Sequence, residues 1–157
     1  MRKLIAALAL FAIACGGGEP ASDEAEPEAP GQAEPAATDH AGTGTVHEVR
    51  MLLTNDGNYV YEPAELTIKV GDTVRWVNVN DVHNVAFYAD QIPSGAAEVL
   101  ETLMPSEGKL GPLSGRLISQ PNESYDITFV GVPTGDYGYF CTPHEALGMV
   151  ATLTIEN

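Results

Sequence analysis

Alternating apolar and polar residues recur along the carboxyl-terminal part of the chain, with the two-residue period of a strand that buries one face. The clearest such runs are residues 66–70, 74–77, 125–129 and 151–155. Turn-forming residues separate them at short intervals, as in Asn-Asp-Gly-Asn at residues 55–58 and Pro-Thr-Gly-Asp at residues 133–136. Short strands divided by such turns predict an all-β sandwich or barrel.

One segment departs from this pattern and has the apolar spacing of a helix. It lies between Gly95 and Met104, and its apolar positions are Ala96, Val99, Leu100, Leu103 and Met104. Ser94 is placed to cap the amino end, and Pro105 cannot continue the helix. The sequence therefore predicts one short helix among the strands.

The amino terminus has the pattern of an export signal. Arg2 and Lys3 precede an apolar run over residues 4–13, small residues flank Ile13, and Cys15 follows. The run is shorter than the roughly 20 residues that a membrane-spanning helix needs. The stretch resembles a bacterial lipoprotein signal, which implies that residues 1–15 are a signal segment ending at a lipidated Cys15. Ordinary signal cleavage, with Cys15 as a spare thiol, is the alternative.

Residues 16–45 have the composition of a disordered tether. They are rich in Ala, Pro, Gly and acidic residues and contain no Lys, Arg or aromatic residue. Such a segment cannot bury enough apolar surface to offset its ordering entropy. We therefore predict a folded domain over residues 46–157, exported to the periplasm or cell surface and anchored to a membrane through lipid on Cys15.

Length and charge narrow the function further. The chain has 157 residues, 44% of them hydrophobic, which suits one domain with a substantial core. It carries 22 acidic residues against 7 Lys and Arg, for a formal net charge of −15. A chain this acidic repels phosphate backbones, so nucleic acid is excluded as a partner.

A group of sulfur and nitrogen donors lies within residues 141–149. Cys141, His144 and Met149 form the pattern Cys-x2-His-x4-Met directly after the aromatic stretch at residues 137–140. Two His, one Cys and a weakly bound Met are the ligands of an electron-transfer copper site. The second His is expected to be His83, which follows the run at residues 74–77 and begins another apolar run. Taken singly, each of these residues is more often a core or solvated side chain; together they predict one copper ion that cycles between Cu(I) and Cu(II).

The remaining polar candidates carry less information. His40 falls in the tether and His47 at the edge of the first strand, and we expect both to be mainly solvated. A second metal site including His47 is the other possibility considered. Glu145 is expected to be a solvent-facing charge near the copper.

Residues 140–144, 148–150 and 82–85 resemble the plastocyanin branch of the small blue copper proteins, the cupredoxins. The likeness extends over about residues 47–155. It implies an eight-stranded Greek-key β-sandwich, and copper ligands at His83, Cys141, His144 and Met149.

The resemblance also implies features around the ligands. Asn84 would hydrogen-bond toward Thr142 and the Cys141 sulfur, joining two distant loops. Pro143 has no N–H to donate to the sulfur, which favours Cu(I) and raises the reduction potential. From the residues themselves we expect the imidazole edge of His144 to reach solvent for docking, within a small apolar patch of Pro143, Ala146, Leu147 and Gly148. Ordinary loop packing of Ala146 and Leu147 is the alternative.

Two departures from plant plastocyanins argue against a photosynthetic partner. Their acidic run before Ile-Pro-Ser-Gly is replaced here by residues 88–91, with a single charge, and Phe140 stands where they have Tyr. The expected partners are instead other redox proteins, such as cytochromes or a terminal oxidase, which dock transiently near His144. We expect the chain to be a monomer that carries single electrons between them.

Three other functions are weighed against electron transfer. We do not expect an enzyme, because four protein ligands leave no open coordination position and no second His cluster is present. Copper delivery without electron relay is the main alternative, although the chain lacks Met-rich or His-rich tracts. A purely structural sandwich with a vestigial site is disfavoured by the complete set of four donors.

Overall fold

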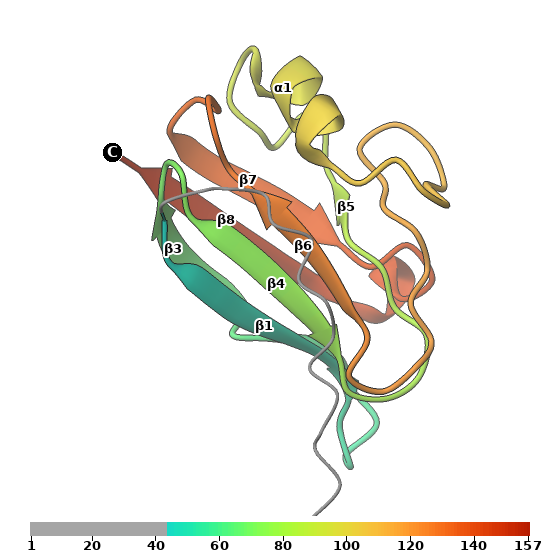
Figure 1. Cartoon of the computed structure of the whole chain (residues 1–157). Helices are drawn as coiled ribbons and strands as arrows, with labels where there is room; N and C mark the ends of the chain where they lie inside the picture. Colours follow the sequence, from blue (N-terminus) through green and yellow to red (C-terminus); the bar gives the residue numbers. More distant parts are fainter. Residues whose placement is uncertain (1–43) are drawn as a thin grey trace, which may run out of the picture. The chain divides into compact units, whose positions relative to one another are not determined.

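Two facing β-sheets form a sandwich in the computed structural model, which describes residues 44–157 (Figure 1). The first sheet has the order β2-β1-β4-β6 and the second β3-β8-β7-β5. The strands are β1 (Val46–Leu53), β2 (Tyr59–Glu62), β3 (Glu65–Lys69), β4 (Thr73–Asn78), β5 (Ala86–Phe87), β6 (Ser124–Thr128), β7 (Gly135–Phe140) and β8 (Val150–Glu156). The β1–β4 and β3–β8 pairs are parallel and the other pairs are antiparallel. The predicted signal and tether lie outside the described residues, apart from the last two residues of the tether.

The four alternating runs of the sequence are strands, and alternation places one face of each in the core. In β4 the buried positions are Val74, Trp76 and Asn78, and in β8 they are Ala151, Leu153 and Ile155. The prediction of an all-β, eight-stranded sandwich with one short helix is thus confirmed.

Aromatic side chains from both sheets meet at the centre of the sandwich. Trp76 of β4 packs edge-on against Tyr139 of β7, with ring centroids 5.6 Å apart, and also lies beside Phe87 and Phe129. All four are buried. Burial of each large apolar side chain contributes about 2–3 kcal/mol, so the sandwich is a rigid base for the loops at its ends.

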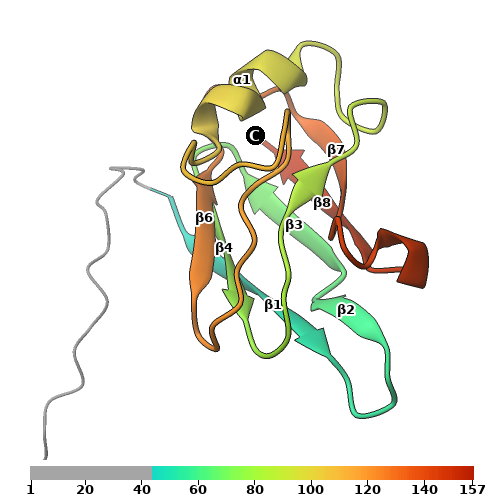
Figure 2. The ribbon, with the colours of Figure 1, turned by 90° about the vertical axis from the view of Figure 1, so that its right-hand side faces the viewer.

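The helix α1 (Ala96–Leu103) buries Ala96 and Leu100 against this core. The prediction that Ser94 caps it is wrong. The cap is Gly95 in the left-handed region at φ 81°, without a side-chain hydrogen bond, and the Ala96 N–H donates instead to the Pro93 carbonyl at 3.0 Å. Figure 2 shows α1 at the opposite end of the molecule from the β1–β2 hairpin. Within residues 44–157, no helix has the length and apolar character needed to cross a membrane.

Candidate metal centre

The predicted donor residues lie in loops that strand ends position. His83 follows β4, in the connection to β5, and Cys141 follows β7 directly. His144 precedes the 3-10 helix η1 (Glu145–Leu147), and Met149 directly precedes β8. Strands β5 and β7 pair with each other, so the sheet brings the two loops side by side.

Three of the four predicted donors come together in the folded chain. The ligand atoms of His83, Cys141 and His144 all lie within 4.8 Å of one another. The Cys141 Sγ is 3.7 Å from Nδ1 of His83 and 3.4 Å from Nδ1 of His144. His83 and Cys141 are fully buried, and His144 is 9% exposed.

Met149, the fourth predicted donor, is tied to the same loop through its backbone. Its N–H donates to the His144 carbonyl at 3.2 Å, and its carbonyl accepts from the Cys141 N–H at 3.1 Å. Its side chain is fully buried. Gly148, at φ 86°, ends η1 in the left-handed region and lets the chain turn back toward β8.

The backbone of His83 is fixed by a short bridge to Ile118. The His83 N–H donates to the Ile118 carbonyl at 3.0 Å, and the Ile118 N–H donates back at 2.8 Å. In the His83 side chain, Nδ1 faces the Cys141 sulfur, and the other ring nitrogen, Nε2, is buried without a hydrogen-bond partner within residues 44–157.

The side chain of Asn84 links the two donor loops. Its Oδ1 accepts from the Thr142 N–H at 2.7 Å, and its Nδ2 lies 3.1 Å from the Thr142 hydroxyl and 3.2 Å from the Gly115 carbonyl. The predicted contact with Thr142 is therefore present. At the Cys141 sulfur it is the Asn84 backbone N–H that lowers the pKa of the thiol, against the larger effect of burial.

Burial keeps all three clustered donors in their neutral forms. It raises the pKa of the Cys141 thiol, an effect that the Asn84 and His144 backbone N–H groups partly offset. Burial also lowers the pKa of His83, with neighbouring His144 as the second cause, and it lowers the pKa of His144. Neutral imidazoles are competent ligands, and a bound cation would stabilise the thiolate that burial otherwise disfavours. The donor set fits a soft transition-metal ion such as copper.

Tyr59 belongs to this site although the sequence did not indicate it. Its ring stacks on His144 with centroids 3.7 Å apart and 13° between planes, and it meets His83 edge-on at 6.0 Å. Its hydroxyl donates to Asp81 Oδ2 at 3.0 Å. This hydrogen bond is the largest cause that raises the pKa of Tyr59, so the phenol stays neutral.

Exposed apolar side chains lie beside His144, as the sequence predicted, but the imidazole itself is less exposed than expected. Pro143, Ala146 and Leu147 are exposed, and Leu147 has 64% of its surface accessible. Tyr59 covers one face of the His144 ring. Any contact with a partner at this end would involve these neighbours together with the imidazole.

His47 differs from its prediction, whereas Glu145 agrees with it and makes an additional contact. His47 is paired and not mainly solvated, since its Nε2 lies 2.9 Å from Asp72 Oδ2; His40 lies outside the described residues. Glu145 is exposed, as predicted, and accepts a hydrogen bond from Tyr88 at 2.9 Å. Tyr88 in turn stacks on Phe140, with ring centroids 4.3 Å apart.

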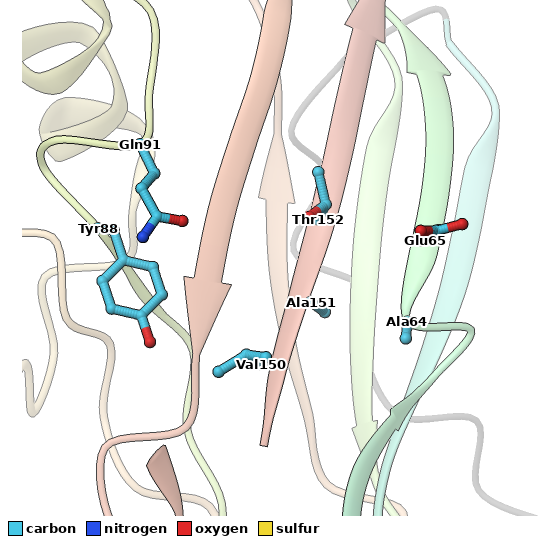
Figure 3. A pocket seen from close by; sticks show the side chains of 7 residues that line it. All are labelled: Ala64, Glu65, Tyr88, Gln91, Val150, Ala151 and Thr152. Atoms are coloured by element: carbon cyan, nitrogen blue, oxygen red, sulfur yellow. The ribbon is translucent and has the colours of Figure 1, made fainter. Parts of the chain in front are cut away.

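A surface hollow of about 350 Å³ is separate from the donor cluster (Figure 3). Its lining consists of Ala64, Glu65, Tyr88, Gln91, Val150, Ala151 and Thr152. None of the donor residues lines it, and Glu65 is its one carboxylate. The donor cluster is therefore a packed group of side chains apart from this hollow.

Comparison with known proteins agrees with this geometry. The model of the family described as copper-binding proteins of the plastocyanin/azurin family matches residues 48–156. The chain belongs to this family. Family membership and the His-Cys-His group together support one bound copper ion.

Its plastocyanin relatives include algal and cyanobacterial proteins. The chain is 39% identical to plastocyanin of Scenedesmus fuscus over 107 residues, which are 67% of this chain and 95% of that protein. It is 41% identical to plastocyanin of Synechococcus sp. over 100 residues, 62% of this chain and 65% of that protein.

Solved cupredoxin structures share the fold. The oxidised plastocyanin of Dryopteris crassirhizoma aligns with a TM-score of 0.54 and 26% identity, covering 70% of this chain and all of that one. Pseudoazurin of Methylobacterium extorquens AM1, at 24% identity and a TM-score of 0.50 over 71% of this chain and 76% of its own, shows the fold alone. This plastocyanin-like cupredoxin thus belongs to a family of electron carriers, which are not enzymes.

Proposed function

We propose that this chain is an exported, membrane-tethered carrier of single electrons, with one copper ion held by His83, Cys141, His144 and Met149. The observation that carries the proposal is the group of two imidazoles and one thiol, whose ligand atoms lie within 4.8 Å of one another in a buried loop cluster. Copper bound there would supply a one-electron couple between Cu(I) and Cu(II).

The protein's own part is to hold the donors still. The His83–Ile118 bridge and the Asn84–Thr142 hydrogen bonds fix the two loops to each other and to the sandwich. Donors held by packing and hydrogen bonds relax little when the charge at the site changes. Cys141 would give up its thiol proton on metal binding, because a thiolate and not a thiol is the metal ligand.

The exposed apolar residues around His144 support a transient docking site there. Pro143, Ala146 and Leu147 offer a small patch of the kind that weak redox complexes bury. We propose that the partners are redox proteins such as cytochromes or a terminal oxidase, and that the chain acts as a monomer.

An absorption spectrum of the full chain titrated with Cu(II) tests the ligand assignment. We expect an intense visible band from charge transfer between the Cys141 thiolate and Cu(II), bleached reversibly by a reductant. Cys141→Ser should abolish the band. His47→Gln is the matched control, because it removes an imidazole that pairs with Asp72 away from the donor cluster, and it should leave the band intact.

A pale or colourless complex in the unaltered chain would contradict the electron-carrier proposal. In that case, rapid transfer of the bound copper to a chelating acceptor would favour a copper-delivery role instead. A band that survives in Cys141→Ser would contradict the assignment of the thiolate as ligand.

The cellular location is proposed from the amino-terminal sequence. Residues 1–15 have the pattern of a lipoprotein signal and residues 16–45 that of a solvated tether. Fractionation of cells that produce the full chain should place it with the membranes, and Cys15→Ser should remove it from them. Equal amounts in the membrane fraction for both forms would contradict anchoring through Cys15.

A further inference from the structure

The side chain of Tyr59 contacts both imidazoles of the donor cluster without offering a ligand atom. It comes from the start of β2 and lies flat on His144, with ring centroids 3.7 Å apart, while His83 meets it edge-on at 6.0 Å. Near-parallel contact over one face limits how far the His144 ring can tilt. The other aromatic neighbour of the His144 ring is His83, with centroids 5.1 Å apart and 66° between planes, whereas residues 143 and 145–148 are exposed.

Tyr59 is itself anchored to the loop that carries His83. Its hydroxyl donates to Oδ2 of Asp81, and Oδ1 of the same carboxylate accepts the Val82 N–H at 2.7 Å. The Asp81 carbonyl accepts from the Asn78 side-chain amide at 3.1 Å. Asp81 adopts φ 62°, an uncommon conformation for a residue with a side chain, which these three bonds hold in place.

We propose that Tyr59, which Asp81 holds in place, is a positioning residue for His144. The Tyr59 ring keeps the imidazole in the plane where Nδ1 faces the Cys141 sulfur, whether or not metal is bound. The contact joins three segments, β2, the loop after β4 and the loop after β7. For its effect on the redox couple, the inference rests on the proposed function. The orientation of the ring in the metal-free chain does not depend on that function.

The test in the metal-free full chain is NMR of the His144 ring protons. A tyrosine ring stacked at this distance shields them, so we expect upfield resonances in the unaltered chain and in Tyr59→Phe, which keeps the ring. Tyr59→Leu should abolish the shielding and broaden or average the resonances. Tyr88→Leu is the matched control, since Tyr88 also stacks on an aromatic ring and donates to a carboxylate, but it stacks on Phe140 and not on an imidazole.

The copper-loaded chain gives a second readout, the reduction potential. We expect it to rise in Tyr59→Leu, since soft donors favour Cu(I) and a less restrained imidazole weakens the nitrogen contribution. Tyr59→Phe should restore the potential of the unaltered chain. Should Tyr59→Leu fail to fold, Tyr59→Met removes the ring and keeps a long apolar side chain.

Unchanged His144 resonances and an unchanged potential in Tyr59→Leu would overturn the inference. Tyr59→Phe behaving like Tyr59→Leu would overturn the role of the stacked ring and leave only the hydrogen bond to Asp81. Failure of the unaltered chain to form a copper–thiolate band would count against the proposed function alone, because the metal-free spectra would still test the stack.

Discussion

Single polar side chains determine how the donor loops are held, and Asn84 links the two loops directly. It is fully buried, and its hydrogen bond to the Gly115 carbonyl is buried as well, whereas its contacts with Thr142 are partly buried. Its side-chain oxygen accepts from the Thr142 N–H. Its side-chain NH2 group lies within hydrogen-bond distance of the Thr142 hydroxyl, the Gly115 carbonyl and, at 3.3 Å, the Ser114 hydroxyl. Leaving a buried donor or acceptor unsatisfied costs more than the hydrogen bond contributes when made.

We therefore expect Asn84→Ala to lower the free energy of unfolding by about 3 kcal/mol, because it leaves the buried Gly115 carbonyl and the partly buried Thr142 N–H without their partner. Chemical denaturation of the metal-free chain followed by circular dichroism measures this. Asn80→Ala is the matched control, since Asn80 also bonds a backbone N–H and a carbonyl, those of Leu53, but on the exposed surface. An equal loss in the two variants would contradict the importance of burial at Asn84.

At the scale of elements, Asp72 joins the β3–β4 turn to the beginning of β1. Its carboxylate accepts from the Thr45 N–H at 2.8 Å and the Lys69 N–H at 3.0 Å, and pairs with His47 at 2.9 Å. The hydrogen bond from the Lys69 backbone, followed by that from His47, lowers the pKa of Asp72 below its usual 3.8. The ionised carboxylate is thus favoured in the folded chain.

The sign of the resulting pH dependence follows from this lowered pKa. Stability contributed by ionised Asp72 is fully present above pH 3.8 and is lost as the pH falls through the lower folded pKa. We expect Asp72→Asn to lower the free energy of unfolding by about 2 kcal/mol at neutral pH, and the difference from the unaltered chain to shrink in the acid range. Urea denaturation at a series of pH values measures it.

The control for Asp72 is another carboxylate with a weaker set of contacts. Asp136 accepts one hydrogen bond, from the Thr154 hydroxyl, on the exposed surface. Asp136→Asn should change the stability little at any pH. A deficit in Asp72→Asn that stayed constant down to the acid range would show that lost packing, and not the lowered pKa, causes it.

At the scale of elements, the sequence predicted only features that depend on residues close together in the chain. The strands followed from alternation within five or six residues, and the Cys141–His144–Met149 group from spacing within one loop. Assigning His83 to the same site required the further expectation that the end of the strand at residues 74–77 lies beside this loop. Contacts between side chains that no motif links, such as Tyr59 with His144 or His47 with Asp72, depend on strand order and register, which the pattern leaves open.

The helix cap shows the same limit at short range. Ser94 had the right residue type for a cap, but the adjacent glycine adopted φ 81° and itself became the cap. Composition alone could not decide between a serine that caps by its side chain and a glycine that does so by its backbone freedom.

Over the whole molecule, negative charge dominates and remains unneutralised near the donor loops. Within residues 44–157, the Arg and Lys residues that form ion pairs do so with carboxylates elsewhere: Arg50 with Glu62, Arg75 with Asp126, Lys109 with Glu101 and Arg116 with Glu123. By contrast, Asp81 and Glu145 accept hydrogen bonds from the neutral hydroxyls of Tyr59 and Tyr88. Two uncompensated carboxylates therefore flank the apolar patch around His144.

This arrangement predicts that cationic partners react faster, in a manner that salt suppresses. With a cationic cobalt(III) phenanthroline complex as oxidant, the second-order rate for the reduced chain should fall by about tenfold between low and high ionic strength. With anionic hexacyanoferrate(III) the rate should rise over the same range. Stopped-flow absorbance of the copper–thiolate band measures both rates.

The location of the effect is tested by removing one carboxylate at a time. Glu145→Gln should reduce the salt dependence of both reactions because it neutralises a charge beside His144, whereas Glu98→Gln on the exposed side of α1 removes the same charge from another part of the fold. Equal effects of the two substitutions would mean that the net charge of −15 acts as a whole and that reagents do not approach at His144. A larger effect at Glu145 would place electron exchange at the patch formed by Pro143, Ala146 and Leu147.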